Sequence, residues 1–204
     1  DGLWQTASVN PALNGLGTVL RGRTLAIWGY GKIGRMVAGY GKAFGMQVMV
    51  WGSETSRAAA IVDGFEAAGS REDFFERADV LTVHLRLSDK TRGLVTHADL
   101  ARMKPTALFV NTSRAELVAE GALEQALTEG RPGSAALDVF TSEPLAAGAP
   151  ILRIPTVLAT PHIGYVEKDS YEMYFGAAFE NIVNFNKGDP TNILNPEALA
   201  KKRG

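Results

Sequence analysis

The stretch TLAIWGYGKIG, residues 24–34, decides the fold of this chain. Its first five residues are mostly apolar, as in a buried strand, and Gly29, Gly31 and Gly34 follow at the spacing G-x-G-x-x-G. In a strand–turn–helix setting the first glycine makes the tight turn, the second lets the backbone approach a pyrophosphate, and the third lets the helix pack on the strand. The stretch therefore predicts a dinucleotide-binding turn, with the phosphates at the N-terminus of the following helix.

Short apolar runs alternate with helical patterns along the rest of the chain. This alternation favours the α/β class and a doubly wound parallel sheet of the Rossmann type. The runs are almost continuously apolar, as expected for strands that are buried on both faces. The predicted strands are 24–28, 47–51, 80–85, 107–111, 135–140 and 156–160, with a weaker candidate at 61–65.

Helical periodicity is found between and after these runs. The first helix follows Gly34, and Ile33, Val37, Tyr40 and Phe44 recur along it at helical spacing. A long helix at 166–185 carries a broad apolar stripe, which could contact another domain or subunit or pack on its own domain. The remaining helices are predicted at 71–77, at 97–103 with Thr96 as the cap, and at 119–129.

Composition narrows the class of protein. The 204 residues contain no cysteine, which excludes disulfides and thiolate metal sites, and the three histidines do not favour a metal site either, so no metal is expected. The formal net charge of −1 does not indicate binding to nucleic acid, and no apolar run approaches the length of a membrane span. We therefore expect a cytoplasmic protein with neither nucleic acid nor membrane as partner.

The end of the second predicted strand bears on the choice between NAD and NADP. An acid that binds the adenosine ribose is usual there, but this chain has Gly52, followed by Ser53, Glu54 and Arg57. A missing acid and a nearby arginine tolerate a 2′-phosphate, so NADP is plausible. Glu54 could still serve NAD, and Arg57 could be a solvated surface residue. The sequence leaves the choice open.

Three polar residues in a fixed order indicate the chemistry: Arg114, Glu143 and His162. A guanidinium binds a carboxylate through two parallel hydrogen bonds, and a histidine can donate and accept a proton near neutral pH. A carboxylate beside a histidine orients the ring and favours its protonated form. Taken singly, each residue could have a structural role, as in a pair between Arg114 and Glu116. Taken together, they point to redox chemistry on a carbon that bears oxygen.

Four motifs in order resemble the signatures of the D-isomer-specific 2-hydroxyacid dehydrogenases. They are GYGKIG at 29–34, NTSR at 111–114, LDVF at 137–140 with EP at 143–144, and TPHIG at 160–164. The resemblance implies that Arg114 binds the substrate carboxylate and carbonyl oxygen, that His162 is the general acid/base, and that Glu143 hydrogen-bonds it. The candidate cofactor-binding residues are Gly29, Tyr30, Gly31, Lys32, Ile33, Gly34, Ser53, Arg57, His84, Thr112, Ser113 and Asp138.

The resemblance also implies a domain organisation. Residues 1–20 resemble a dimer-forming arm, 21–164 the dinucleotide-binding domain, and 165–204 the C-terminal helix and tail of a substrate domain whose N-terminal part is missing. We therefore expect a homodimer, and an isolated chain that binds NAD or NADP but turns over a D-2-hydroxy acid or 2-keto acid poorly or not at all.

Two alternatives stay open at this point. The same fold also serves corepressor-like modules that sense NAD(H) through binding, and fold alone does not establish chemistry. A formate-type enzyme on the same scaffold is disfavoured, because it places glutamine where this chain has Glu143.

Overall fold

A computed structural model of the chain describes residues 17–200. Most of the expected N-terminal arm, residues 1–16, and the end of the tail, residues 201–204, therefore lie outside the described residues. The chain divides into two compact units, residues 1–161 and residues 162–204.

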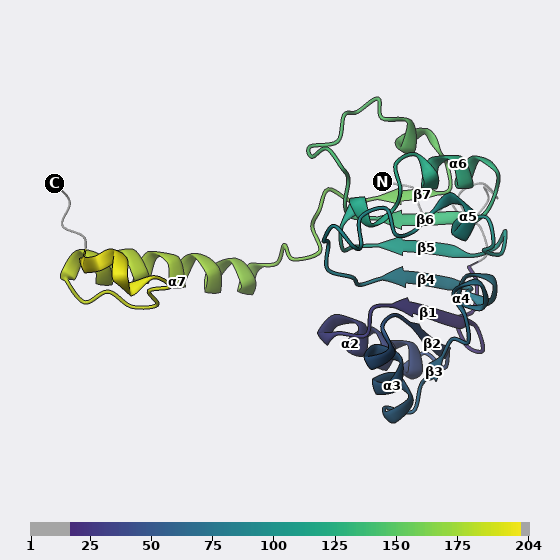
Figure 1. Ribbon diagram of the computed structural model, residues 1–204. Helices are drawn as coiled ribbons and strands as arrows, with labels where there is room; N and C mark the ends of the chain where they lie inside the picture. Colours follow the sequence, from purple (N-terminus) through teal and green to yellow (C-terminus); the bar gives the residue numbers. More distant parts are fainter. Residues whose placement is uncertain (1–16, 201–204) are drawn as a thin grey trace, which may run out of the picture. The chain divides into compact units, whose positions relative to one another are not determined.

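The first unit is built on a seven-stranded sheet in the order β3-β2-β1-β4-β5-β6-β7, in which all neighbours are parallel (Figure 1). This order confirms the predicted doubly wound α/β fold. The strands are β1 (Thr24–Trp28), β2 (Gln47–Trp51), β3 (Glu66–Ala67), β4 (Val80–Val83), β5 (Leu108–Asn111), β6 (Ser134–Leu137) and β7 (Val157–Ala159).

Helices cover the two faces of this sheet unequally. On one face, α4 (Arg71–Arg77), α5 (His97–Leu100) and α6 (Ala122–Thr128) bury a continuous core that includes Phe74, Phe75 and Phe109. On the other face, α2 (Lys32–Ala43) and α3 (Glu54–Val62) pack over β1 and β2 around Ile27 and Val50. Two short 3₁₀ helices, η1 (Ala115–Leu117) and η2 (Pro150–Arg153), lie in the connections near β5 and β7.

The α2 face of the sheet is less well covered over β4 to β7. Alternation along these strands directs Val80, Val110, Ala136 and Leu158 to that face. The first three are only partly buried and Leu158 is 66% exposed. Among the described residues, this half of the face therefore lacks the cover that a doubly wound sheet normally has.

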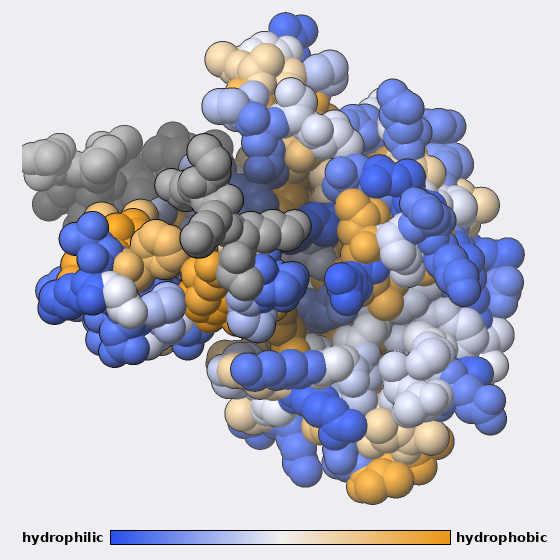
Figure 2. Space-filling model, turned by 60° about the vertical axis from the view of Figure 1, so that its left-hand side comes forward, coloured by the Kyte–Doolittle hydropathy of each residue, from blue (hydrophilic) through white to orange (hydrophobic). Residues whose placement is uncertain are grey.

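Helix α2 presents its large apolar residues outward rather than to the sheet. Its buried residues are Gly34, Ala38 and Gly41, whereas the predicted stripe is exposed, with Ile33 at 62%, Tyr40 at 58% and Phe44 at 63% and only Val37 partly buried. Small residues face β1 and β2 because a Cβ added at Gly41 would lie 2.5 Å from the Leu25 side chain. Met36, at 51%, extends the exposed stripe. On the face of the molecule drawn in Figure 2, hydrophobic residues (orange) reach the surface in several separate places.

The predicted strand at 61–65 is wrong. Residues 54–62 form α3, a helix that was not among the predicted elements, and the third strand is the two-residue β3, which pairs with β2. Ser53 caps α3 by accepting a hydrogen bond from the amide of Ser56, and this local contact favours a helix here.

The second unit is dominated by α7 (Lys168–Lys187), which is followed by η3 (Pro196–Ala200). The side chain of Glu167 caps the helix by accepting from the amides of Asp169 and Ser170, and Gly188 ends it in a left-handed conformation. No residue of α7 is buried, and its aromatic rings form a row in which Tyr171, Phe175 and Phe179 are neighbours. In residues 17–200 no helix combines the length and apolar character that crossing a bilayer requires.

Candidate cofactor and active site

The glycine turn after β1 has the geometry that close approach to a phosphate requires. Gly29 has φ +104°, and a Cβ there would lie 2.7 Å from the backbone oxygen of His84. A Cβ at Gly34 would lie 2.1 Å from the backbone oxygen of Gly29, so α2 can sit on the turn only with glycine there. The first and third glycines thus serve the tight turn and the helix–strand contact.

The second glycine leaves room for a ligand. A Cβ at Gly31 would meet no atom within 4 Å, and Gly31 is the N-cap of α2 without a capping side chain. The first turn of α2 also contains no acid. Its amide groups and its positive dipole end are therefore suited to an anion, and the turn fits the pyrophosphate of a dinucleotide.

The carboxyl end of β2 carries a glycine and a nearby arginine where an acid for the adenosine ribose is usual. Gly52 has φ +151°, a conformation that L side chains rarely adopt, so an acid here would strain the backbone. The Arg57 guanidinium lies 4.8 Å from the centre of the Trp51 ring, and its buried Nε has no hydrogen-bond partner among the described residues. Ser53 is exposed beside it.

The carboxyl ends of β4 and β5 are joined next to the glycine turn. The amide of His84 donates to the Trp28 oxygen over 2.8 Å, and the Ser113 hydroxyl donates to the Leu85 oxygen over 2.9 Å. Burial lowers the pKa of His84, so its ring is neutral at ordinary pH, with Nε2 3.1 Å from the Thr82 hydroxyl. His84 is thus suited to lining the cleft rather than to carrying a charge.

Arg114 is exposed at the same edge of the sheet, three residues after β5. Its guanidinium donates 2.6 Å to the Ser113 oxygen, and no ion pair to it is found among the described residues. Below it, the buried side chain of Asn111 donates 2.9 Å to the Arg114 oxygen and accepts 3.0 Å from the Ser113 amide. Asn111 was not among the predicted site residues, although it opens the NTSR motif. Thr112 lies exposed in this loop.

Two carboxylates follow β6. Asp138 is 5% exposed and accepts a 2.5 Å hydrogen bond from the Thr160 hydroxyl, which ties the ends of β6 and β7 together. Glu143 is exposed and its carboxylate accepts 2.8 Å from the Phe140 amide, which folds the loop back on itself. Both acids therefore have structural contacts within the first unit.

His162 is the first residue of the second unit. It has φ +54°, in a region that residues with a side chain seldom occupy and that is over-represented at functional sites. Its ring meets the Tyr165 ring edge-on at 6.0 Å. The first unit thus holds the predicted cofactor residues together with Arg114 and Glu143, while the predicted acid/base belongs to the other unit.

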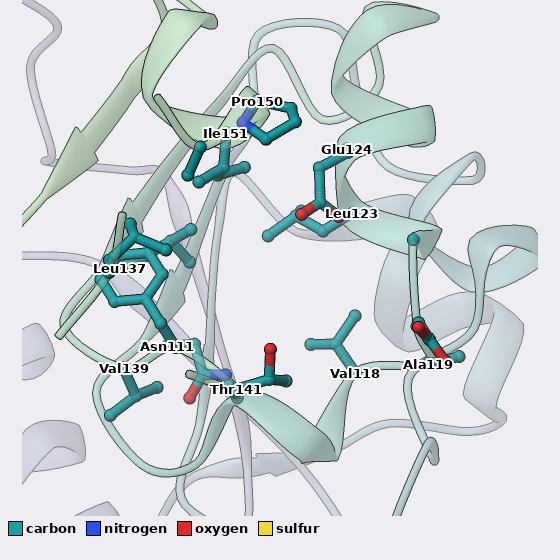
Figure 3. Close-up of a pocket in the computed structure, with 16 residues that line it drawn as sticks. Asn111, Val118, Ala119, Leu123, Glu124, Leu137, Val139, Thr141, Pro150 and Ile151 are labelled. Carbon is teal, nitrogen blue, oxygen red and sulfur yellow. The ribbon is translucent and has the colours of Figure 1, made fainter. Parts of the chain in front are cut away.

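A separate cavity of about 310 Å³ lies between α6, the end of β6 and η2 (Figure 3). Leu123 of α6, Leu137 of β6 and Ile151 of η2 contribute apolar walls, with Asn111 at one end. None of its lining residues belongs to the glycine turn, so this cavity is separate from the predicted pyrophosphate position. Within residues 17–200 no group of three His, Asp or Glu side chains is arranged to hold a metal ion.

Comparisons with known proteins agree with this geometry. Residues 3–164 match the NAD binding domain of the D-isomer specific 2-hydroxyacid dehydrogenases. A glyoxylate reductase of Aeropyrum pernix is 40% identical over 185 residues, which cover 90% of this chain and 55% of that protein. The chain thus spans about half the length of this relative.

Solved structures show the same partial coverage. A provisionally named D-3-phosphoglycerate dehydrogenase oxidoreductase from Ralstonia solanacearum is 59% identical with a TM-score of 0.86, over 92% of this chain and 55% of that one. An NADPH-dependent glyoxylate/hydroxypyruvate reductase from Sinorhizobium meliloti, in complex with NADP and sulfate, is 29% identical with a TM-score of 0.65, over 83% of this chain and 54% of that one.

Proposed function

This chain belongs to the D-isomer specific 2-hydroxyacid dehydrogenase family, and we propose that it is the cofactor-binding part of an enzyme that interconverts a D-2-hydroxy acid and a 2-keto acid. One observation carries the proposal. The glycine turn and the exposed guanidinium of Arg114 lie at the same carboxyl edge of one parallel sheet, where open α/β sheets bind ligands.

The proposed chemistry assigns one task to each polar residue. Bound NAD(P)H would supply the hydride that reduces the carbonyl carbon. Arg114 binds the substrate carboxylate through its planar guanidinium and polarises the carbonyl. His162 donates a proton to the carbonyl oxygen and removes it in the reverse direction. Glu143 accepts a hydrogen bond from the imidazole, which stabilises its protonated form.

We further propose that NADPH is preferred to NADH. The absence of an acid at Gly52, the strained φ that an acid would adopt there, and the unpaired Nε of Arg57 all support a 2′-phosphate at the end of β2. The reductase from Sinorhizobium meliloti that shares this fold is described with NADP. Glu54, which is exposed at the start of α3, is the one acid close in sequence that opposes the preference.

The second unit is proposed to belong to a substrate domain, with the dinucleotide-binding domain ending near residue 164. The exposed aromatic row of α7 supports this assignment, because such a surface requires cover by other polypeptide. The half-covered face of β4 to β7 has the same requirement. We also propose a cytoplasmic homodimer, in which the arm at 1–20 and the exposed stripe of α2 contribute to the contact.

The cofactor assignment is tested by calorimetric titration of this chain with NADPH and NADH. Saturable binding of one molecule per chain is expected, with tighter binding of NADPH. Absence of binding to either cofactor would contradict the proposal, and equal binding would remove the NADPH preference alone.

The catalytic assignment is tested in the complete enzyme with glyoxylate and other 2-keto acids as substrates. His162→Ala is expected to lower kcat by at least about 100-fold, the usual contribution of a general acid, with unchanged affinity for the cofactor. An NAD(H)-sensing binding module predicts a different result. In that case the wild-type protein binds cofactor but reduces none of the keto acids.

A further inference from the structure

The residue between the first two glycines of the turn is anchored away from the cofactor cleft. Tyr30 is only 5% exposed, and its ring packs edge-on against Phe65 with centroids 6.2 Å apart. Its hydroxyl donates a 2.8 Å hydrogen bond to a carboxylate oxygen of Asp63, 33 positions along the chain. Tyr30 therefore contributes to the site through its backbone, while its side chain is directed into the protein.

A second residue converges on the same carboxylate. Arg35, in the first helical turns of α2, hydrogen-bonds the Asp63 oxygen that accepts from Tyr30. Its guanidinium also lies 4.7 Å from the centre of the Tyr30 ring. An arginine so close to a helix N-terminus would be expected from sequence to bind phosphate. Here its charge is already engaged by Asp63 and by the aromatic face.

Asp63 connects this cluster to the other end of the cofactor site. It is the C-cap of α3, the helix whose N-terminus carries Ser53 and Arg57. Burial first, and then the hydrogen bond to Asp63, raise the pKa of Tyr30 to about 12. The tyrosine hydroxyl is therefore a constant donor at any ordinary pH.

The turn needs such an anchor because of its glycines. Gly29 adopts φ +104°, and a Cβ built at Gly31 would have no protein atom within 4 Å, so neither residue is held by side-chain contacts of its own. Glycine loses more conformational freedom on ordering than any other residue, and a loop that is ordered only on binding weakens the observed affinity. The one side chain between these two glycines is that of Tyr30.

We infer that Tyr30, Asp63 and Arg35 form an anchor that holds the glycine turn in its phosphate-binding conformation before the cofactor arrives. Tyr30 and Asp63 are positioning residues, and Arg35 serves the anchor rather than the phosphate. The inference rests on the proposed function in one respect only, that the turn binds a dinucleotide.

The test uses the variants Tyr30→Phe, Asp63→Asn and the double variant of this chain. Calorimetry gives the Kd for NADPH and NADH, and hydrogen–deuterium exchange reports on the amides of residues 29–34. Each single variant is expected to raise both Kd values about threefold to tenfold, the range for loss of one preorganising hydrogen bond to a charged group. The double variant is expected to raise Kd by less than the product of the two single effects, because Tyr30 and Asp63 share one hydrogen bond; Asp63→Asn in addition removes the charge that pairs with Arg35.

Exchange separates positioning from a general loss of stability. In the free variants, the amides at 29–34 should exchange faster while those of β4 and β5 stay protected, and saturating cofactor should restore protection of the turn. Glu76→Gln is the matched control, because it removes the 2.7 Å ion pair with Arg102, which shares no residue with the anchor. This control should leave Kd and exchange at the turn unchanged.

Three results would overturn the inference. The first is a Kd within twofold of wild type in both single variants, and the second is faster exchange that spreads equally over the sheet. The third is an Arg35→Gln variant that weakens binding well beyond the Asp63→Asn variant, which would make Arg35 a phosphate ligand. Should Asp63→Asn fail to fold, Tyr30→Phe carries the test, because it keeps the buried ring. Failure of wild type to bind would instead contradict the proposed function.

Discussion

The buried side chain of Asn111 holds the backbone of Arg114 in position. Its Nδ2 lies 2.9 Å from the Arg114 oxygen, and its Oδ1 accepts from the Ser113 amide over 3.0 Å. Because Asn111 is the last residue of β5, the position of the Arg114 backbone is fixed by the end of this strand.

We therefore predict that Asn111→Ala is harmful both to the fold and to substrate binding. It leaves a backbone donor and a backbone acceptor without their partner, which should lower the free energy of unfolding by about 2 kcal/mol. In the complete enzyme, the KM for the keto acid should rise about tenfold while cofactor affinity changes little. Denaturant titration and steady-state kinetics measure the two effects. Thr128→Ala, which removes one exposed hydrogen bond to the Glu124 oxygen, is the control.

Substitution by alanine should affect two glycines of the turn differently: at Gly34 it should lower stability, and at Gly31 it should weaken cofactor binding. At Gly34 the added Cβ would lie 2.1 Å from the Gly29 oxygen, so Gly34→Ala should lower stability by about 3 kcal/mol. At Gly31 the methyl group meets no protein atom, so Gly31→Ala should fold with a stability within about 1 kcal/mol of wild type. It should nevertheless weaken cofactor binding at least about tenfold, since it fills the space for the pyrophosphate. Thermal unfolding and calorimetry compare the two variants. Unchanged binding in Gly31→Ala would place the phosphates elsewhere.

The sheet could be predicted from the sequence because buried parallel strands are almost continuously apolar. All six main predicted strands are confirmed within three residues at either end, and the capping of α5 by Thr96 is confirmed as a capping box. Residues 61–65 failed because the β-branched pair Ile61 and Val62 resembles a strand in isolation. Ser53, a favourable N-cap residue directly before α3, is the local signal from which this helix could have been predicted.

Periodicity located α2 but not its buried face. The spacing of Ile33, Tyr40 and Phe44 is the same whether the stripe faces the sheet or the surface. What decides is the close approach of the helix to β1 and β2, which admits only Gly34, Ala38 and Gly41. The distance between a helix and the sheet is known only once the chain is folded. The spacing of large apolar residues therefore does not predict which face of α2 is buried.

The motif residues of the site were predictable, whereas their supports were not. The family resemblance that picked out the glycine turn and Arg114 is confirmed by the match over residues 3–164. The roles of Arg114, Glu143 and His162 remain predictions. Asp63 carries no local signal, because its partner Tyr30 is 33 residues away and only the fold brings them together.

Arg57 should discriminate between the two cofactors. Its guanidinium is stacked on Trp51 and its buried Nε has no partner among the described residues, so a 2′-phosphate would satisfy it. Arg57→Met should raise the Kd for NADPH about tenfold and change the Kd for NADH less than about twofold. Fluorescence titration with both reduced cofactors measures this ratio. Arg102→Met, at an exposed ion pair, should change neither value. An equal loss for both cofactors would show that Arg57 only supports the fold.

Asp99 should make the free energy of unfolding depend on pH in the acid range. Burial opposes its ionisation, but hydrogen bonds from Arg71 and Thr96 outweigh burial and lower its pKa. Because the pKa of Asp99 is lower in the folded than in the unfolded chain, its ionised form stabilises the fold. This contribution is complete above the unfolded-state aspartate pKa of about 4 and is lost as the pH falls through the pKa of the folded state. Asp99→Asn should therefore cost about 2 kcal/mol at pH 7. Denaturant titrations down the pH scale should show the difference from wild type shrinking below about pH 4. A difference that stays constant with pH would assign the loss to packing.

The exposed stripe of α2 should be part of the contact between two copies. Tyr40 and Phe44 are 58% and 63% exposed on a helix that contains three basic residues and no acid. The double change Tyr40→Lys with Phe44→Lys would add like charges on both sides of a two-fold contact and remove its apolar area. It should raise the dissociation constant of the dimer at least about tenfold. Sedimentation velocity over a concentration series measures that constant. Val62→Lys changes a residue of α3 that is 85% exposed and should leave the dimer intact. Equal dissociation in this control, or a wild-type chain that is monomeric at every concentration, would exclude α2 as the contact.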